Sequence, residues 1–500
     1  MSYLSRKLIL KNMASLEEIR NNRLEKLKTL AQNGIESYPI SSNRNYELEK
    51  VIADFDNLSN EKSVSLAGRV MSLRPQGALI FFHLDDGTAR FQGLLKKDEM
   101  KESDFDIFSA NVDIGDFIEV KGSLFITKRG EKTIKADSWK MLSKSLRPLP
   151  EKWHGLSDTE ERFRRRYLDI LMSSEVKARF ILRSRVISEL RKILDGAGFL
   201  EVETPMLQSL AGGASAEPFK TRHNALNIDL FLRIAPEIYL KKLLIGGFSK
   251  VYEIGRSFRN EGIDMTHNPE FTTVEWYESY SDSTKQMFFV ESVIRKIVKE
   301  TMGEETIAFQ GNEIDFSKKF ETVSYLDLLK KYAGIESPES ITKEEIISIA
   351  KKLAIKTDKS DSLEKIMDSI YKKTCRPRLI QPTFINNYPV NYLPLAKKTN
   401  KDKNLADAFQ VVAGGMEIVK AFSELNDPID QRERFVVQEK YRKEGDKEAQ
   451  PADEEFIEAM EYGIPPAGGL GLSIDRLTML LSDTKNIKEV ILFPAMRPRD

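Results

Sequence analysis

The chain has little cysteine, no net charge and no long apolar run. Cys375 is the only cysteine in 500 residues, which excludes disulfides within the chain and cysteine-based metal sites. Lys plus Arg and Asp plus Glu both number 77, so any nucleic-acid contact must come from local patches. The apolar run nearest the start, "LIL", is too short for a signal peptide, and nothing approaches a membrane helix of roughly 20 residues. We therefore expect a cytoplasmic protein without a membrane partner.

Residues 1–62 are predicted to form a helical extension. The segment "SLEEIRNNRLEKLKTLAQNG" has the spacing of a capping box at Ser15 and Glu18, and Gly34 ends its helical pattern. Met13 precedes this helix, so residues 1–12 are expected to be dispensable. One face of this helix carries Arg20, Arg23, Lys26 and Lys28. Two interpretations are open: the face is solvated, or it contacts phosphate.

Residues 63–148 contain five short strand patterns separated by turn signals, which favours a five-stranded OB-fold barrel. A groove of basic, aromatic and amide side chains can stack single-stranded bases and recognise their edges. Aromatic residues in strands belong just as often to a core, so both interpretations stay open. The side chains concerned are Arg69, Arg74, Phe81, Phe91 and Gln92.

Residues 149–172 are predicted to be a linker, and 173–500 a larger α+β domain. A long amphipathic helix is expected over 174–197, ended by Gly198. The strands that follow are too irregularly spaced for βαβ units, so an antiparallel sheet flanked by helices is expected. Residues 322–375 are rich in Lys and Glu and are predicted to be a helical insertion. The expected strands lie near 199–203, 228–234, 250–256, 271–278, 408–412, 416–423 and 468–473.

The familiar nucleotide-binding loops are absent. No Gly-x-x-x-x-Gly-Lys-Ser/Thr sequence occurs, and "GGLGL" (468–472) does not match the dinucleotide fingerprint. The segment "KMLSKS" (140–145) resembles a signature of class I aminoacyl-tRNA synthetases. The His-Ile-Gly-His-like element that accompanies that signature is missing, so we expect 140–145 to end the barrel.

The segment "VYEIGRSFRNEGIDMTHNPEFTTVEWYESY" is predicted to be a hairpin rich in reactive side chains. Arg259 suits a phosphate because its planar guanidinium donates two parallel hydrogen bonds. Phe271 could stack on a purine, and Glu261 could accept from an exocyclic amine or pair with an arginine. A plain hairpin with a surface ion pair is the alternative. A second arginine, Arg476, follows the glycines of "GGLGLSIDRL", which weakens that alternative.

These residues carry a resemblance to a known family. "FLEVETPML" (199–207), the Arg259 hairpin and "GLGLSIDRL" resemble the three motifs of class II aminoacyl-tRNA synthetases. "GGASAEPF", "LRIAPEIYLKKLLIGGF", "FSELND" and "ILFPAMRP" resemble the bacterial lysyl-tRNA synthetases more closely, over roughly residues 15–500. The resemblance implies an OB-fold that recognises the anticodon and a catalytic domain that uses ATP, L-lysine and tRNA(Lys).

The resemblance also implies roles in ATP binding. Arg259 would hold the α-phosphate and the substrate carboxylate, Arg476 the γ-phosphate, and Phe271 would stack on adenine. The family mechanism needs positioning and charge compensation rather than a protein nucleophile. Further ATP-binding positions would be Glu261, His267, Asn268, Glu417 and Gly471.

A substrate with two ammonium groups needs anionic partners, because an unpaired buried charge is costly. By the resemblance, Gly213 and Glu237 hold the α-amino group, Tyr277 and Glu424 hold the ε-ammonium, and Glu275 lies nearby, with Arg259 on the carboxylate. An aspartate-specific relative would need basic residues instead. The family therefore implies lysine rather than aspartate or asparagine.

Two residues depart from the family pattern. The family has Glu where Gln410 stands and Asn where Lys420 stands. In the family, the glutamate at the position of Gln410 and the one that matches Glu417 bind magnesium that bridges the ATP phosphates. Our hypothesis is that the Lys420 ammonium replaces part of the metal's role. An impaired or regulatory paralogue that binds nucleic acid is the alternative. Glu217 is a smaller departure of unknown effect.

The resemblance implies two partners beyond the small substrates. Phe81, Gln92 and Arg74 match or lie near anticodon-contacting positions, with Phe81 stacking on the central uridine. The first motif, centred on Pro205, implies a homodimer, because that strand packs across a twofold axis in the class. A truncated relative that modifies elongation factor P lacks the barrel, and residues 63–147 are present here.

Overall fold

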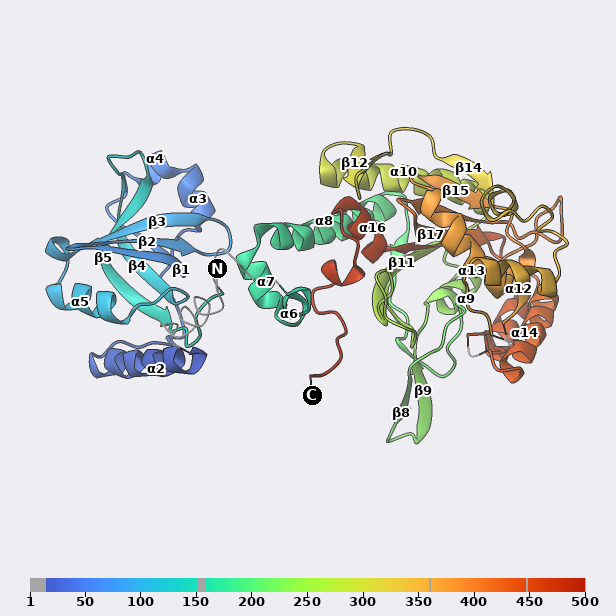
Figure 1. Cartoon of the computed structure of the whole chain (residues 1–500), viewed down its shortest axis with the longest axis horizontal. Helices are drawn as coiled ribbons and strands as arrows, with labels where there is room; N and C mark the ends of the chain where they lie inside the picture. The colour runs from blue at the N-terminus through green and yellow to red at the C-terminus, as the bar shows by residue number, and fades with distance from the viewer. Residues whose placement is uncertain (1–14, 151–155, 157, 359–360, 447, 500) are drawn as a thin grey trace. The chain divides into compact units, whose positions relative to one another are not determined.

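The computed structural model describes residues 15–150, 156, 158–358, 361–446 and 448–499. The expectations for residues 1–12 and Met13, and for 151–155 and 157 of the linker, lie outside the described residues. The chain divides into two compact units, residues 1–155 and 156–500 (Figure 1). The finer domain limits at 62, 148 and 172 remain predictions.

The first unit is a closed five-stranded barrel with strand order β1-β2-β3-β5-β4, which confirms the predicted OB-fold architecture. Its core combines strand residues such as Phe82 and Val120 with Phe105 and Phe108 from a helix between β3 and β4 that the sequence did not predict. The elements are α2 (Leu16–Gln32), α3 (Leu48–Ala53), α4 (Phe55–Leu58), β1 (Val64–Gln76), β2 (Leu79–Asp85), β3 (Arg90–Lys96), η1 (Lys97–Glu99), α5 (Glu102–Asn111), β4 (Phe117–Ile126) and β5 (Lys132–Ser143).

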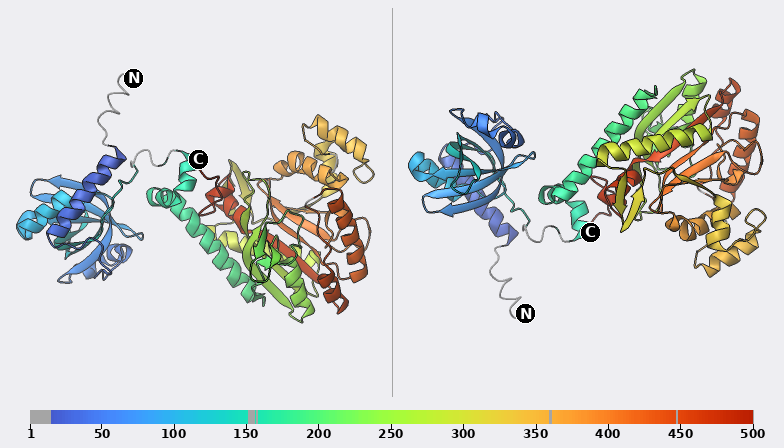
Figure 2. Two further views of the ribbon diagram at one scale, coloured as in Figure 1. Left: turned by 90° about the horizontal axis from the view of Figure 1, so that it is seen from below. Right: turned by 90° about the horizontal axis from the view of Figure 1, so that it is seen from above.

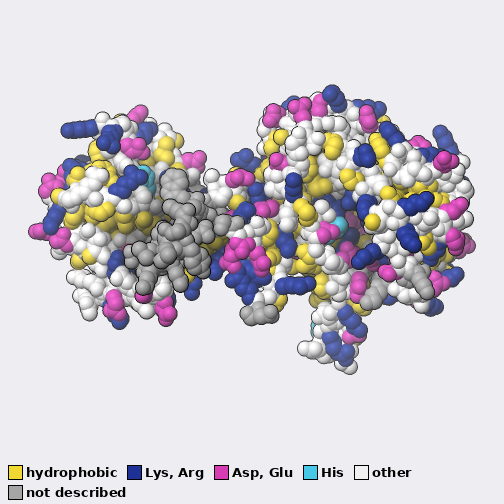
Figure 3. Space-filling model, in the orientation of Figure 1, with side chains coloured by type: hydrophobic (Ala, Val, Ile, Leu, Met, Phe, Trp, Pro, Cys, Tyr) yellow, Lys and Arg dark blue, Asp and Glu magenta, His cyan; other side chains and the backbone are white. Residues whose placement is uncertain are grey.

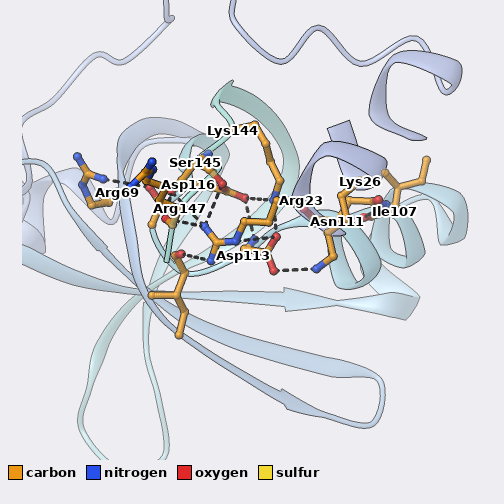
Figure 4. A network of polar contacts seen from close by, with 12 residues as sticks. Arg23, Lys26, Arg69, Ile107, Asn111, Asp113, Asp116, Lys144, Ser145 and Arg147 are labelled. Atoms are coloured by element: carbon orange, nitrogen blue, oxygen red, sulfur yellow. Dashed lines mark hydrogen bonds and ion pairs between the residues drawn. The ribbon is translucent and has the colours of Figure 1, made fainter. Parts of the chain in front are cut away.

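Helix α2 begins at the predicted capping box and lies along one side of the barrel (Figures 1 and 2). Neither interpretation of its basic face holds for Arg23, which is buried and donates to the carbonyls of Ser145 at 2.9 Å, Arg147 at 3.1 Å and Ile114 at 3.0 Å (Figure 4). Lys26 binds Asp113 at 2.7 Å. These two residues attach the helix to the barrel, because carbonyls left unpaired there would be costly.

The second unit contains an eight-stranded sheet of order β14-β15-β16-β17-β18-β11-β10-β6. All neighbours from β15 to β10 are antiparallel, and the two edge strands pair in parallel. The expected antiparallel sheet is thus confirmed. Its strands are β6 (Leu200–Glu201), β10 (Lys250–Phe258), β11 (Glu270–Ser279), β14 (Glu321–Ser324), β15 (Thr383–Asn386), β16 (Ala408–Ala413), β17 (Met416–Ser423) and β18 (Ala467–Ser473).

Three helices and one face of this sheet form the largest core. They are α8 (Ser174–Gly196), α10 (Ser283–Met302) and α16 (Ile474–Leu481). Strand alternation sends Val274 and Trp276 of β11, and Leu470 and Leu472 of β18, into this core. The residues between them therefore face the opposite side, where α9 (Glu237–Ile245) packs through Leu240 against Tyr277 and its neighbours.

Two segments differ in secondary structure from the sequence-based expectations. Residues 322–324, expected in the helical insertion, belong to β14 because they pair with β15. The predicted linker from Thr159 onward instead forms α6 (Thr159–Arg164) and α7 (Arg166–Met172). There the Arg166 guanidinium is buried and pairs with Asp169 at 2.6 Å, which a solvated linker would not do.

The remaining elements surround the sheet. The β8–β9 hairpin projects from the body of the second unit (Figures 1 and 2). Helices α12 and α13 lie near one end of that unit (Figure 1). These remaining elements are β7 (Leu207–Gln208), β8 (Lys220–His223), β9 (Ile228–Leu232), β12 (Thr306–Phe309), β13 (Asn312–Asp315), α11 (Tyr325–Leu328), the π-helical turn η2 (Leu329–Ala333), α12 (Lys343–Lys352), α13 (Leu363–Thr374), η3 (Arg376–Arg378), η4 (Val390–Tyr392), α14 (Pro428–Lys443), α15 (Glu454–Glu461) and η5 (Ile487–Glu489).

Acidic and basic side chains are mixed over the visible surface of both units (Figure 3), which agrees with the equal numbers of each in the sequence. Within the described ranges, no helix is both long and apolar enough to cross a bilayer.

Candidate active site

A cavity of about 270 Å³ opens on the sheet face opposite the main core. Strand alternation makes its floor polar: Thr273, Glu275 and Tyr277 point into it from β11, and Gly469 and Gly471 of β18 lie beside them. Many of the residues singled out from the sequence line it, namely Gly213, Glu237, Arg259, Glu261, His267, Asn268, Phe271, Glu275, Tyr277, Glu417, Lys420, Gly471 and Arg476. Glu424 and Gln410 do not line it.

The predicted hairpin is formed by β10 and β11, with Arg259 and Phe271 on either side of its loop. The Arg259 guanidinium carbon lies 5.0 Å from the centre of the Phe271 ring, so a cation and an aromatic face share one wall of the cavity. The Nε atom of Arg259 is buried and has no hydrogen-bond partner among the residues that the structure describes. A buried donor of this kind is available to an anionic ligand.

The second arginine closes the same end of the cavity. Arg476 donates to the Glu417 carbonyl at 3.0 Å and lies 3.1 Å from Nε2 of His267, whose Nδ1 is 2.8 Å from Asp264. Burial would raise the pKa of Glu417, but the cations Arg476 and Lys420 among others hold it below its ordinary value. Arg259, Arg476 and Lys420 line this end of the cavity together with the carboxylates of Glu261 and Glu417.

The other end is acidic. Burial, followed by the charge of Glu237, raises the pKa of Glu275 to about 8, and the Tyr277 hydroxyl donates to Glu275 at 3.1 Å. Burial also raises the pKa of Glu424 to about 8. Gly213 has φ +89°, and a side chain there would press on Glu237. Such a cluster of desolvated acids favours a cationic ligand, which would restore their ionised forms.

Glu424 lies beside the cavity floor. A Cβ atom at Gly469, which lines the cavity, would collide with the Oε1 atom of Glu424 and with the Tyr277 ring, so the glycine leaves room for this carboxylate. The Oε2 atom is 2.5 Å from the ammonium of Lys241. The sequence reasoning did not single out Lys241. Its position four residues after Glu237 on one helix was an available signal, because such pairs share a helix face.

Gln410 and Lys420 are direct cross-strand partners on β16 and β17. The Gln410 side chain is buried, and its carbonyl oxygen accepts from Tyr388 at 2.8 Å, whereas Lys420 is exposed and lines the cavity. In the part of the chain that the structure describes, no group of three or more His, Cys, Asp or Glu could hold a metal ion. Magnesium bound with ATP usually takes one or two carboxylates besides phosphate, so Glu417 fits as a single ligand and Gln410 does not.

The candidate anticodon surface is the outer face of the barrel strands β1, β2 and β3. Arg74 is opposite Phe81, and His83 is opposite Gln92, whose amide donates to Thr133 at 2.8 Å. One residue proposed for the same groove lies elsewhere, since Phe91 is opposite Leu84 and is 3% exposed in the core. Arg69 is opposite Asp85 on the outer side of the barrel, where its guanidinium stacks on Phe117 at 4.1 Å.

The first motif, residues 199–207, runs along the sheet edge. Its strand β6 pairs only with β10 among the described strands, and Leu200, Met206 and Leu207 are each about half exposed. Exposed apolar residues beside an unpaired strand edge are typical of an interface. Glu217, the smaller departure from the family pattern, accepts from the Asn260 amide through its backbone carbonyl at 2.7 Å.

Comparison with known proteins gives the class first. Residues 158–497 match the family described as tRNA synthetases class II (D, K and N), and residues 64–142 match the OB-fold nucleic acid binding domain. The fold and the cavity thus belong to a class II aminoacyl-tRNA synthetase, with the sheet and barrel that the sequence predicted.

Individual relatives narrow the class. The chain is 47% identical to the lysine–tRNA ligase of Pelotomaculum thermopropionicum over 97% of its own length and 96% of the relative. It is 44% identical to that of Carboxydothermus hydrogenoformans, over 97% of its own length and 99% of the relative, and 44% identical to that of Lactococcus lactis subsp. cremoris, over 97% and 100%. The chain belongs to the lysine–tRNA ligase family.

Proposed function

We propose that this enzyme activates L-lysine with ATP, releasing pyrophosphate and forming lysyl-adenylate, and then transfers lysine to the 3′ end of tRNA(Lys). One observation carries the proposal: a single cavity has carboxylates at one end and two arginines at the other. Lysine and ATP together have the complementary charges, two ammonium groups at one end of the reacting pair and a triphosphate at the other.

The ATP end would work by positioning. Arg259 would bind the α-phosphate and the lysine carboxylate, so that the carboxylate oxygen attacks phosphorus and pyrophosphate leaves in line. Arg476 would hold the γ-phosphate and Phe271 would stack on adenine, with Glu261, His267, Asn268 and Gly471 around the nucleotide. The unpartnered Nε of Arg259 and the aromatic ring beside it support this arrangement.

The lysine end would recognise two ammonium groups. Gly213 and Glu237 would bind the α-ammonium, and Tyr277 and Glu424 the ε-ammonium, with Glu275 beneath them. The raised pKa values of Glu275 and Glu424 support this assignment, since a cation would lower both and bind tightly in return.

The lysyl-tRNA synthetase family uses magnesium with ATP. We infer that this chain holds the ion through Glu417 and the ATP phosphates, where it would neutralise phosphate charge. The Lys420 ammonium takes over part of that charge, because Gln410 is already bound to Tyr388. We therefore expect fewer magnesium ions at this site than a pair of carboxylates would hold.

The tRNA anticodon would bind the outer barrel face through Arg74, Phe81 and Gln92. We also propose a homodimer formed through residues 199–207, which the exposed apolar edge at Leu200 supports. We further propose a cytoplasmic location, which the buried free thiol of Cys375 supports.

The decisive experiment is amino-acid-dependent exchange of pyrophosphate into ATP, in which lysine is compared with ornithine, arginine and aspartate as alternative substrates. Lysine should support exchange far better than the other three. Equal exchange with all four amino acids would reject the lysine assignment.

A second candidate is a paralogue that binds nucleic acid without catalysis, and the Gln410–Tyr388 hydrogen bond is the observation that favours it. No exchange with any amino acid, combined with retained tRNA binding, would establish it instead.

A further inference from the structure

Lys241 is a fully buried lysine that the proposed mechanism does not use. It lies on α9, one helical turn after Glu237, and its side chain has no exposed surface. The aromatic rings of Phe422 and Phe456 have their centres 5.4 and 6.0 Å from its ammonium nitrogen. An ammonium in such surroundings is costly unless it is paired.

Its two partners are acids assigned to the two ends of the substrate. The Lys241 nitrogen is 2.5 Å from Oε1 of Glu237 and 2.5 Å from Oε2 of Glu424. Because both oxygens touch the same nitrogen, they lie no farther apart than twice that distance. One side chain thus fixes the spacing between a carboxylate on α9 and a carboxylate after β17.

Lys241 leaves the cavity side of these acids available. Glu237 lines the cavity itself. The Oε1 atom of Glu424 is buried, has no hydrogen-bond partner in the described part of the chain, and faces Gly469 on the cavity floor. Each carboxylate has a second oxygen, so a ligand cation can bind without displacing Lys241.

The charges then match. Glu237, Glu275 and Glu424 supply three carboxylates, and Lys241 neutralises one of them. Two negative charges remain, which equals the number of ammonium groups on lysine, while Arg259 faces the substrate carboxylate. The buried Arg233 is paired with Glu253 and adds no net charge.

We propose that Lys241 is a resident counter-ion that positions Glu237 and Glu424 and sets the charge of the lysine pocket to match a diammonium substrate. This inference rests on the proposed function and deepens it by adding a residue that determines specificity without touching the substrate.

The consequence is a defined pH dependence. The groups facing this cluster are Glu237 from α9, Glu424 after β17, Glu275 and Tyr277 from β11, and the more distant Arg233 and Arg259. Burial raises the pKa of Glu424, and Lys241 opposes that rise. Without Lys241, Glu424 would stay protonated to higher pH and would lose its attraction for an ammonium group.

The test compares wild type with Lys241→Met in the exchange assay between pH 6.5 and 9. We expect the KM for lysine to rise roughly tenfold or more at pH 7 and to recover as pH increases. The KM for ATP should change less than about threefold, since Lys241 lies at the lysine end. Lys242→Met is the matched control, because the neighbouring Lys242 approaches Glu455 at 3.8 Å and the Tyr239 ring at 5.5 Å, and every parameter should stay as in wild type.

The outcomes separate the two ideas. A wild type without lysine-dependent exchange would reject the proposed function. An active wild type whose pH profile is unchanged by Lys241→Met would overturn the role of Lys241, as would an equal loss for lysine and ATP at every pH. Should Lys241→Met not fold, Lys241→Arg keeps the charge and should keep the wild-type pH midpoint for lysine. A shifted midpoint in that variant would contradict the counter-ion role.

Discussion

At the scale of single residues, we propose that Gln410 and Lys420 change how the charge of the ATP phosphates is balanced. Replacing Glu by Gln removes one negative charge, and replacing Asn by Lys adds one positive charge. The two changes add two units of positive charge, which equals the charge of one magnesium ion. The two residues are opposite each other on β16 and β17. The chemistry of the cavity can thus stay constant while its metal content changes.

This exchange of charge predicts the behaviour of the double variant Gln410→Glu with Lys420→Asn. We expect its pyrophosphate exchange to need several-fold more magnesium than wild type, because a site that held an ammonium now needs a divalent ion. Titration of magnesium at fixed ATP measures this. The single variant Lys420→Asn, which removes the cation without adding a ligand, should lose activity that magnesium does not restore. Unchanged activity and magnesium dependence in the double variant would rule the idea out.

A second prediction concerns the stability of the acidic end. The pKa of Glu275 is raised to about 8 from its ordinary value of 4.5, so the folded unit holds a proton there that the unfolded chain releases. That contribution is complete below pH 4.5 and is lost as pH rises towards 8. Because Gln cannot ionise, the Glu275→Gln variant should gain about 1–2 kcal/mol relative to wild type between pH 6 and 8, allowing for partial exposure.

Thermal or urea unfolding of both proteins at the two pH values measures this difference. Saturating lysine should reduce the difference, since the bound cation keeps Glu275 ionised in the wild type. A difference in unfolding free energy that is constant across pH would mean that Glu275 is not the group concerned.

At the scale of elements, helix α2 is held by charged hydrogen bonds rather than by a broad apolar face, since only Arg23 and Leu30 within it are buried. The Arg23→Met variant keeps the apolar stem but removes the donor from three carbonyls, of which that of Arg147 keeps a second donor, the Ser145 hydroxyl at 2.8 Å. We expect the free energy that protects α2 from hydrogen exchange to fall by about 2–4 kcal/mol. Hydrogen exchange of residues 16–32 in the full chain should become faster by a corresponding factor.

Arg20→Ala is the matched control, because Arg20 is exposed on the same helix and its loss should cost under about 0.5 kcal/mol. Equal exchange rates in the Arg23→Met variant and wild type would show that other contacts hold the helix.

The elements also explain what the sequence could and could not predict. The sequence was enough to predict strands close to β10, β11, β17 and β18. The two aromatic positions of the barrel were not separable, since only the strand register sends Phe91 inward and Phe81 outward. Arg23 occupies an unremarkable helical position, and its role depends on carbonyls distant in sequence. Helical spacing could have paired Lys241 with Glu237, whereas its contact with Glu424 depends on the fold.

At the scale of the whole molecule, two compact units divide the work. We expect Phe81→Ala to lower aminoacylation efficiency for tRNA about tenfold, because stacking of one base contributes roughly 1–3 kcal/mol. Pyrophosphate exchange should be unaffected, since it needs only the second unit. Lys121→Ala, exposed on β4 of the same barrel, provides the control for a general loss of charge. An equal loss in both assays would contradict this division.

The contacts of Arg23 also bear on the order in which the protein is made. Its acceptors at Ser145 and Arg147 lie 122 and 124 residues later in the chain. At a synthesis rate of about 5–20 residues per second, α2 waits roughly 6–25 s for its binding site to leave the ribosome. The first unit can then close as its last strand emerges, before most of the second unit has been translated. An anticodon-binding barrel would thus be complete while its catalytic partner is still being synthesised.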